Sequence, residues 1–225
     1  MTHLWVRAEQ RKNEERVGVT PDGAAELLKA GVQVTIEQST VRAIGIEGYQ
    51  AAGCIIAPEN SWPSAPSDAI IFGLKELPED GTPLTHCHIM FGHAYKGQPS
   101  GRVLLDRFKA GGGTLYDLEY LVDQAGRRVA AFGYWAGYAG AAVALRCWIA
   151  QQRDEIAGPV GVFKSSDALL KNLQEHMAQH NKTKLNALII GALGRVGTGA
   201  ADLLSTLDIP VTKWDMAETA SGGPF

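Results

Sequence analysis

The sequence predicts an α/β protein with mostly parallel sheets. Short apolar segments alternate with helical or turn segments over the first half, as in a parallel sheet that is covered on both faces. Near the end, a glycine-rich turn stands between an apolar strand and a helix, which is typical of a nucleotide-binding unit. The chain is therefore expected to hold two Rossmann-like domains, the second of them incomplete.

The composition indicates a globular protein with one or two domains: 225 residues, 45% hydrophobic and 20% charged, with a net charge of −3. The mild acidity offers no basic stripe for nucleic acid, and no apolar run reaches the ~18 residues of a membrane-spanning helix. We therefore expect no nucleic-acid or membrane partner; the oligomeric state stays open. Three scattered cysteines and a start without a signal-peptide pattern predict a cytoplasmic protein with reduced thiols.

The first half of the chain reads as strand, helix and strand in succession. An opening strand at 4–6 precedes a helix at 20–31. Thr20 can cap that helix, and Pro21 suits its first position. Residues 32–36 alternate apolar and polar, as a half-buried strand does. The same rhythm predicts a short helix at 48–52 and strands at 54–56, 69–72 and 89–91.

Lys75 and His93 each follow a predicted strand closely. Because ligands collect at the carboxyl ends of parallel strands, both side chains are expected to face one crevice. Arg16, after the first strand, and Arg127 and Arg128 would add cations suited to carboxylates. Taken singly, the lysine reads as a surface charge and the histidine as a loop residue. Together they favour a site for proton transfer.

One short segment has the spacing of a metal site. His86 and His88 flank Cys87, and ligands two residues apart can converge on one ion. No second cluster supplies further ligands, so no metal site is expected.

The middle of the chain is predicted to be helical. Residues 134–152 are rich in alanine, and their glycines would permit close packing. Residues 158–164 read as a connector, and 166–180 as an amphipathic helix. His176 and His180 lack the carboxylate of a zinc motif and are interpreted as residues of the solvent face.

The last part reads as the beginning of a nucleotide-binding domain. A strand at 184–190 leads into the turn, and a helix at 195–207 and a strand at 211–215 follow. Glycines in such a turn let backbone N–H groups approach a pyrophosphate at the helix N-terminus. The glycines are Gly191, Gly194 and Gly197, whose spacing differs from the commoner Gly-x-Gly-x-x-Gly. The alternative is a tight turn without a ligand.

Asp215 stands at the end of the strand that follows this helix. A carboxylate there can accept hydrogen bonds from the ribose hydroxyls of adenosine and repel a 2′-phosphate. The preceding strand, the helix and this acid together favour a nucleotide site, with NAD rather than NADP as the cofactor.

Several motifs occur in combination: Val6–Glu9, Glu15–Pro21, Gly73–Glu79, Phe91–Lys96, Gly113–Glu119, Gly126–Gly133, Ile190–Arg195 and Lys213–Asp215. Together they resemble NAD-dependent, lysine-forming saccharopine dehydrogenase, of the superfamily that is similar to alanine dehydrogenase and transhydrogenase. The resemblance spans essentially the whole chain.

The resemblance implies a reaction and two catalytic residues. The family oxidises the secondary amine of saccharopine to an imine with NAD and hydrolyses it to L-lysine and 2-oxoglutarate. Lys75 would take the proton from the amine, and His93 would act as acid and base in the addition of water and the collapse of the carbinolamine. Glu76 and Glu119 match acidic residues of the cleft that would tune the charge of both groups.

The resemblance also implies binding residues. Arg16, Gln98 and Phe132 match positions that hold the substrate, together with Lys75. The matching nucleotide contacts are Arg127, Gly191, Gly194, Arg195, Gly197, Asp215 and Thr219. Ser221 stands where fungal members have a basic residue.

The resemblance suggests three parts of the chain. Residues 1–133 are expected as a substrate domain similar to the N-terminal domain of alanine dehydrogenase, 134–183 as connecting helices, and 184–225 as the start of a truncated NAD-binding domain. The family continues for over a hundred further residues. The sequence is thus expected to be a fragment, or a protein that borrows the rest.

Two competing hypotheses stay open. The first is an alanine dehydrogenase-like or other opine-type amino-acid dehydrogenase, because those enzymes also carry an Arg-Val-x-x-Thr-Pro segment with a lysine and a histidine. The second is a truncated, non-catalytic module that binds a nucleotide or an amino acid, since hydride transfer requires the reacting atoms at ~3–3.5 Å.

Overall fold

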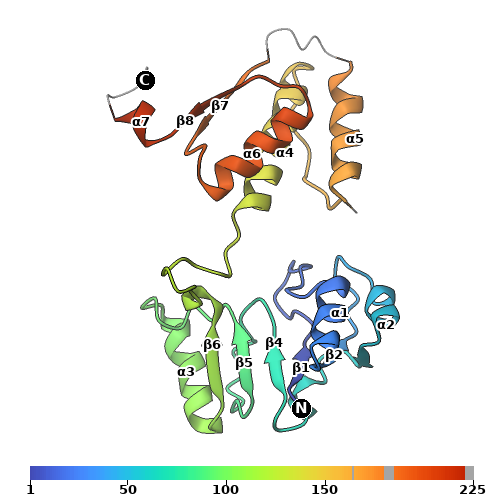
Figure 1. Ribbon diagram of the computed structural model, residues 1–225, viewed down its shortest axis with the longest axis vertical. Helices are drawn as coiled ribbons and strands as arrows, with labels where there is room; N and C mark the ends of the chain where they lie inside the picture. The colour runs from blue at the N-terminus through green and yellow to red at the C-terminus, as the bar shows by residue number, and fades with distance from the viewer. Residues whose placement is uncertain (164, 180–184, 221–225) are drawn as a thin grey trace. The chain divides into compact units, whose positions relative to one another are not determined.

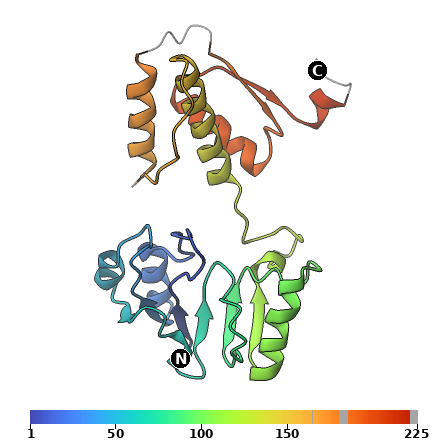
Figure 2. The same ribbon diagram turned by 180° about the vertical axis from the view of Figure 1, so that it is seen from behind.

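The computed structural model describes residues 1–163, 165–179 and 185–220 (Figures 1 and 2). The chain divides into two compact units, Met1–Ala131 and Phe132–Phe225. The first contains a six-stranded sheet and the second a two-stranded sheet. No helix within the described ranges is long and apolar enough to cross a membrane.

The first unit is built on a fully parallel sheet with the strand order β3-β2-β1-β4-β5-β6. The predicted α/β class with a parallel sheet is confirmed. The strands are β1 (His3–Val6), β2 (Gln33–Glu37), β3 (Ile55–Ala57), β4 (Ile70–Phe72), β5 (Cys87–Met90) and β6 (Thr114–Asp117).

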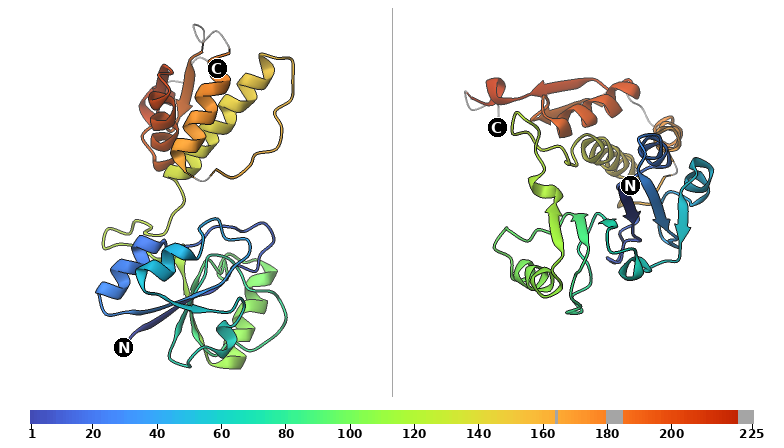
Figure 3. Two further views of the ribbon diagram at one scale, coloured as in Figure 1. Left: turned by 90° about the vertical axis from the view of Figure 1, so that its right-hand side faces the viewer. Right: turned by 60° about the horizontal axis from the view of Figure 1, so that its bottom comes forward.

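Helices cover both faces of this sheet. The helices α1 (Pro21–Lys29) and α2 (Glu47–Ala52) pack side by side (Figure 3). Val6 of β1 packs in their core, whereas its neighbour Trp5 packs in the core that contains α3 (Pro99–Gly111). This division follows from the strand geometry, because successive side chains point to opposite faces. Two 3₁₀ turns, η1 (Trp62–Ser64) and η2 (Leu118–Tyr120), complete the unit.

The predicted helix start at Thr20 is confirmed in detail. The Thr20 hydroxyl accepts a hydrogen bond from the Gly23 N–H at 3.1 Å, and Pro21 begins the helix. Helix α3 and strand β6 were not predicted from the sequence. Their signals were present, because Pro99 starts α3 and Gly112 ends it in the left-handed conformation, with φ of 74°.

The second unit combines a small parallel sheet with closely packed helices. Its strands β7 (Ala187–Ile190) and β8 (Val211–Trp214) pair in parallel, and its helices are α4 (Tyr134–Gln151), α5 (Ser166–Met177), α6 (Arg195–Thr206) and the short α7 (Met216–Thr219). A Cβ at Gly137 of α4 would overlap the Val196 carbonyl oxygen of α6. The segment expected to connect two domains therefore packs as part of the second unit.

Two histidine interpretations can be compared with the structure. His176 is not a residue of the solvent face, because its side chain is half-buried and its Nδ1 lies 2.7 Å from the Asn172 carbonyl oxygen. His180 lies outside the described residues.

His88 is buried, edge-on to Trp62 and Phe108, and burial lowers its pKa to about 3. Among the residues with described positions, no group of three or more His, Cys, Asp or Glu could hold a metal ion.

Candidate active site

The charged residues of the first unit gather beyond the carboxyl ends of its strands. The loops after β1, β4, β5 and β6 contribute residues 7–16, 73–76, 91–96 and 117–120. Since all the strands are parallel, these loops share one edge of the sheet. Lys75 and His93 both lie in these loops, at the same edge of the sheet.

Arg16 lies in a close ion pair with Glu14. Its Nε and Nη2 donate to the two Glu14 carboxylate oxygens at 2.7 and 2.5 Å. The Arg16 guanidinium lowers the pKa of Glu14, and the charge of Lys75 adds to that shift. Glu14 in turn raises the pKa of Arg16. Glu14, which was not predicted from the sequence, thus hydrogen-bonds with Arg16 and lies within the electrostatic influence of Lys75.

His93 lies between the two acidic residues predicted to tune the site. Its Nε2 is 3.7 Å from the Glu76 carboxylate, and its Nδ1 is 4.0 Å from that of Glu119. Both distances are too long for hydrogen bonds but short enough for electrostatic attraction to an imidazolium. His93 also has a φ of 50°, a conformation in which side chains are uncommon and which occurs preferentially at functional sites.

Glu119 is the centre of a cluster of cations. Lys96 Nζ lies 2.9 Å and Arg128 Nη1 3.0 Å from its carboxylate. Lys96 is the main cause of a lowered pKa for Glu119, and Arg128 and His93 contribute. Glu76 similarly pairs with Arg11 at 3.2 Å. A protonated His93 would therefore have a carboxylate on either side, each of which also pairs with a cation.

Other predicted substrate residues are less closely tied to this cluster. Gln98 is the exposed N-cap residue of α3, and its side chain does not cap the helix. Phe132 is 55% exposed at the start of the second unit. Arg127 lies in a turn of the first unit, where its Nε donates to Asp123 at 3.1 Å.

Three charged residues of the site, Glu14, Arg11 and Lys96, were not predicted from the sequence. A signal was available for two of them, because Glu14 stands two residues before Arg16 and Lys96 ends the motif that contains His93. Arg11 carried no such signal, since its pairing with Glu76 depends on how two distant loops fold together.

The glycine turn of the second unit leads from β7 into the N-terminus of α6. Gly191 has a φ of 78°, and a Cβ at Gly197 would overlap the Gly191 carbonyl oxygen. Gly194 is the N-cap residue of α6, and no side chain caps the helix there. The N-terminus of a helix is a place where backbone N–H groups can bind an anion such as a pyrophosphate.

Asp215 closes this turn from the neighbouring strand end. Its Oδ2 accepts from the Leu193 N–H at 2.9 Å, and its Oδ1 from the Met216 N–H at 2.9 Å. Both bonds lower its pKa, with that from Leu193 the larger cause. The Thr219 hydroxyl donates to the Asp215 carbonyl at 2.9 Å. Arg195 is the first residue of α6, and Ser221 lies outside the described residues.

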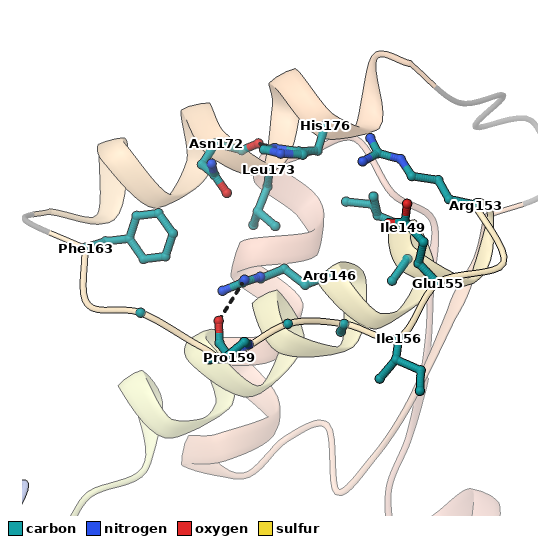
Figure 4. A pocket seen from close by; sticks show the side chains of 14 residues that line it. Arg146, Ile149, Arg153, Glu155, Ile156, Pro159, Phe163, Asn172, Leu173 and His176 are labelled. Carbon is teal, nitrogen blue, oxygen red and sulfur yellow. Dashed lines mark hydrogen bonds between the residues drawn. The ribbon is translucent and has the colours of Figure 1, made fainter.

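A separate cavity of about 430 Å³ lies in the second unit, between the end of α4, the segment 155–163 and α5 (Figure 4). Arg146 projects into it and donates to the Pro159 carbonyl at 3.2 Å. Ile149 and Leu173 form part of its apolar lining. None of the predicted site residues lines this cavity.

Comparison with known proteins shows a family that the sequence matches and a relative that it resembles. The model of the family "Alanine dehydrogenase/PNT, N-terminal domain" matches residues 5–139. A curated relative, "Saccharopine dehydrogenase [NAD(+), L-lysine-forming]" of Schizosaccharomyces pombe, is 46% identical over 99% of this chain. The chain spans 63% of the length of that relative.

Two solved structures have a similar fold. The transhydrogenase from Sinorhizobium meliloti has a TM-score of 0.59 at 16% identity, with 97% of this chain and 62% of that chain covered. An L-alanine dehydrogenase has a TM-score of 0.56 at 19% identity, with 98% and 58% covered. At these identities the likeness extends to the fold alone.

Proposed function

The chain belongs to the alanine dehydrogenase/PNT N-terminal domain family, and from this membership we propose that it serves an NAD-dependent enzyme that cleaves saccharopine to L-lysine and 2-oxoglutarate. Its similarity to the saccharopine dehydrogenase of Schizosaccharomyces pombe supports this substrate over alanine. Residues 1–133 would bind the substrate, and 184–225 would begin the nucleotide-binding domain. The proposed location is the cytoplasm.

The observation that carries the proposal is the pair of titratable groups at one edge of the sheet. Lys75 lies close enough to Glu14 for its charge to lower the pKa of that carboxyl, whereas His93 lies between Glu76 and Glu119. Two proton-transfer groups with different surroundings suit a reaction that needs a base in one step and an acid–base group in others.

In the proposed reaction, Lys75 accepts the proton of the substrate's secondary amine, and the hydrogen on the adjacent carbon leaves as a hydride, so that the C–N bond becomes the C=N bond of an imine. Bound NAD supplies the acceptor for that hydride. His93 then transfers a proton from the water that adds to the imine carbon to the imine nitrogen. As the C–N bond of the carbinolamine breaks, His93 transfers the hydroxyl proton to the same nitrogen, so that the C=O bond of 2-oxoglutarate forms and L-lysine leaves as the amine. Glu76 and Glu119 stabilise the positive charge that His93 acquires.

Binding residues follow from the same proposal. Arg16 would hold a substrate carboxylate in exchange for Glu14, with which it forms two hydrogen bonds. Gln98 and Phe132 would make further substrate contacts. The nucleotide would lie on the turn formed by Gly191, Gly194 and Gly197, with contacts from Arg127, Arg195, Asp215 and Thr219.

The direct test is the formation of NADH, followed at 340 nm, when the protein is mixed with NAD and saccharopine, with L-alanine in a parallel sample. Activity with saccharopine and not with alanine is the expected result. Activity with alanine would transfer the assignment to an alanine dehydrogenase-like enzyme. Absence of activity in both samples, with NAD binding retained, would favour a non-catalytic binding module.

A further inference from the structure

The segment Val6–Glu9 contains two charged residues that no proposed catalytic step uses. Arg7 and Glu9 stand just beyond the end of β1, at the same sheet edge as Lys75. Their side chains are only 1% and 6% exposed. Charged side chains are almost never so deeply buried unless they have specific partners.

The Glu9 carboxylate binds the backbone on the amino side of Lys75. One oxygen accepts from the Leu74 N–H at 2.6 Å and the other from the Lys75 N–H at 3.0 Å. Two consecutive peptide N–H groups are thus fixed by one carboxylate. Such charge-assisted bonds are stronger than bonds between neutral groups.

Arg7 binds the same short segment on its carboxyl side. Its Nη2 donates to the Lys75 carbonyl oxygen, and its Nη1 donates to the Ala8 carbonyl at 3.1 Å. A Cβ at Gly73 would overlap the guanidinium, so glycine is the residue that leaves room for it. The backbone of Lys75 is consequently held through its N–H by Glu9 and through its carbonyl by Arg7.

Fold stability alone does not explain this arrangement. Burial lowers the pKa of Arg7, against the opposing effect of Glu9, so the charged guanidinium is costly to keep there. The Arg7 Nε has no hydrogen-bond partner among the described residues. A buried ion pair is often no more stabilising than apolar residues of similar volume, so stability does not account for this pair.

We propose that Arg7 and Glu9 are positioning residues that hold the Lys75 backbone from both sides and so direct its amine toward the substrate. The inference rests on the proposed function, because Lys75 needs positioning only if its amine transfers a proton. Neither side chain touches the substrate in this assignment. Their effect on the reaction passes entirely through Lys75.

The test is a double-mutant cycle in the 225-residue chain. Arg7→Met is expected to lower kcat for saccharopine oxidation ~100-fold, as a misplacement of about 1 Å does, with the KM for NAD within twofold of the parent. Arg7→Lys should recover part of the loss, because one ammonium can still donate to the Lys75 carbonyl but cannot replace the planar fork. Glu9→Gln should lower kcat in the same way, since its amide keeps one acceptor and loses the other.

Comparing Arg7→Met in the parent and in the Lys75→Met variant separates a positioning role from a general loss of structure. In Lys75→Met, adding Arg7→Met should cause no further loss of turnover. An equal loss in both backgrounds would overturn the proposal, as would full activity of Arg7→Met alone. The matched control is Arg102→Met, an exposed arginine of α3 that pairs only weakly with Asp106 at 3.9 Å and should leave kcat unchanged.

A second readout applies if the parent chain does not oxidise saccharopine, a result that counts against the proposed function itself. Hydrogen exchange of the Leu74 and Lys75 amides reports whether Glu9 and Arg7 hold this segment. Arg7→Met and Glu9→Gln should accelerate both amides at least ~10-fold relative to Arg102→Met. Unchanged exchange would overturn the positioning role whatever the activity.

Discussion

The two units build their candidate sites in opposite ways. In the first unit the site consists of charged side chains, with His93 between two carboxylates and Glu119 among Lys96 and Arg128. In the second unit the site is a turn from which side chains are excluded, since a Cβ at Gly197 would overlap the Gly191 carbonyl. One site depends on the chemistry of its residues, the other on the space they leave.

The same contrast extends to the cores. In the first unit, helices pack on both faces of a six-stranded sheet and form a core with each face. The second has two strands, and Leu188 and Ile190 of β7 remain 45% and 55% exposed. Its main core forms instead where α4, α5 and α6 meet. Substitutions should therefore affect the first unit through charge and the second through the close approach of helices.

Replacement of Lys75 by methionine tests the chemical character of the first site and carries the largest expected effect. Methionine keeps the length of the side chain but cannot accept a proton, so turnover of saccharopine should fall by about 10²–10⁴-fold. The affinity for NAD should change little. Steady-state kinetics combined with NAD titration measures both quantities.

The matched control for this substitution is Lys109→Met, at an exposed lysine in the last turn of α3. It removes the same charge away from the proposed site and should leave turnover unchanged. If Lys75→Met retained the turnover of the parent, Lys75 would lose its catalytic role.

His88 should make the first unit sensitive to acid. Its pKa is about 3 in the folded state and ~6.5 when unfolded, so the unfolded chain binds more protons between these values. Stability is therefore complete above pH ~6.5 and should decrease as the pH falls toward 3, by on the order of 2 kcal/mol at pH 5. Hydrogen exchange of β4 and β5 amides at pH 7.5 and pH 5 measures this loss.

Replacement of His88 by leucine should remove most of that pH dependence. Neither ring nitrogen has a hydrogen-bond partner among the described residues, so an apolar side chain leaves no new group unpaired. His86→Leu is the comparison, because the His86 ring lies 3.2 Å from the Ala65 carbonyl oxygen and that contact would be lost. An unaltered acid response in His88→Leu would assign the effect to other groups.

Most strands, and the positions of Lys75 and His93 after them, could be predicted from the sequence. The ion pairs and hydrogen bonds around these two residues could not. Lys75 and His93 could be found because each follows an apolar strand of a parallel sheet. The strand β6 was not predicted because it is an edge strand. Its residues Thr114 and Tyr116 are exposed, so the sequence shows only a weak hydrophobic pattern there. The pairing of Arg128 with Glu119 could not be predicted, because it depends on side-chain conformations that arise only after the loops have folded.

Two glycines of α4 test the role of excluded side chains in the second unit. Gly137→Ala should destabilise it by about 1–3 kcal/mol, since the added methyl group would overlap the Val196 carbonyl and separate α4 from α6. At Gly140 a Cβ meets no atom within 4 Å, so Gly140→Ala should stabilise α4 by about 1 kcal/mol. Hydrogen exchange in α4 and α6 measures both. Equal effects at the two positions would show that helix propensity, not packing, decides.

Asp215 places a negative charge beside the glycine turn of the second site. Removal of this charge should change nucleotide affinity only slightly, which is the smallest of the expected effects. Asp215→Asn keeps an oxygen that can accept from the Leu193 N–H but loses the negative charge near the expected position of the ribose. The ratio of NAD to NADP affinity should fall about tenfold, or about 1.4 kcal/mol, because the repulsion of a 2′-phosphate disappears. Equilibrium titration with both nucleotides measures the ratio without requiring turnover. Asp208→Asn removes the same charge just after α6, at a φ of 56° that asparagine tolerates, and should leave the ratio unchanged. An equal change in both variants would show that the preference for NAD over NADP depends on net charge and not on the position of Asp215. The Asp215 side chain would then have no specific role, and the second site would depend on its backbone.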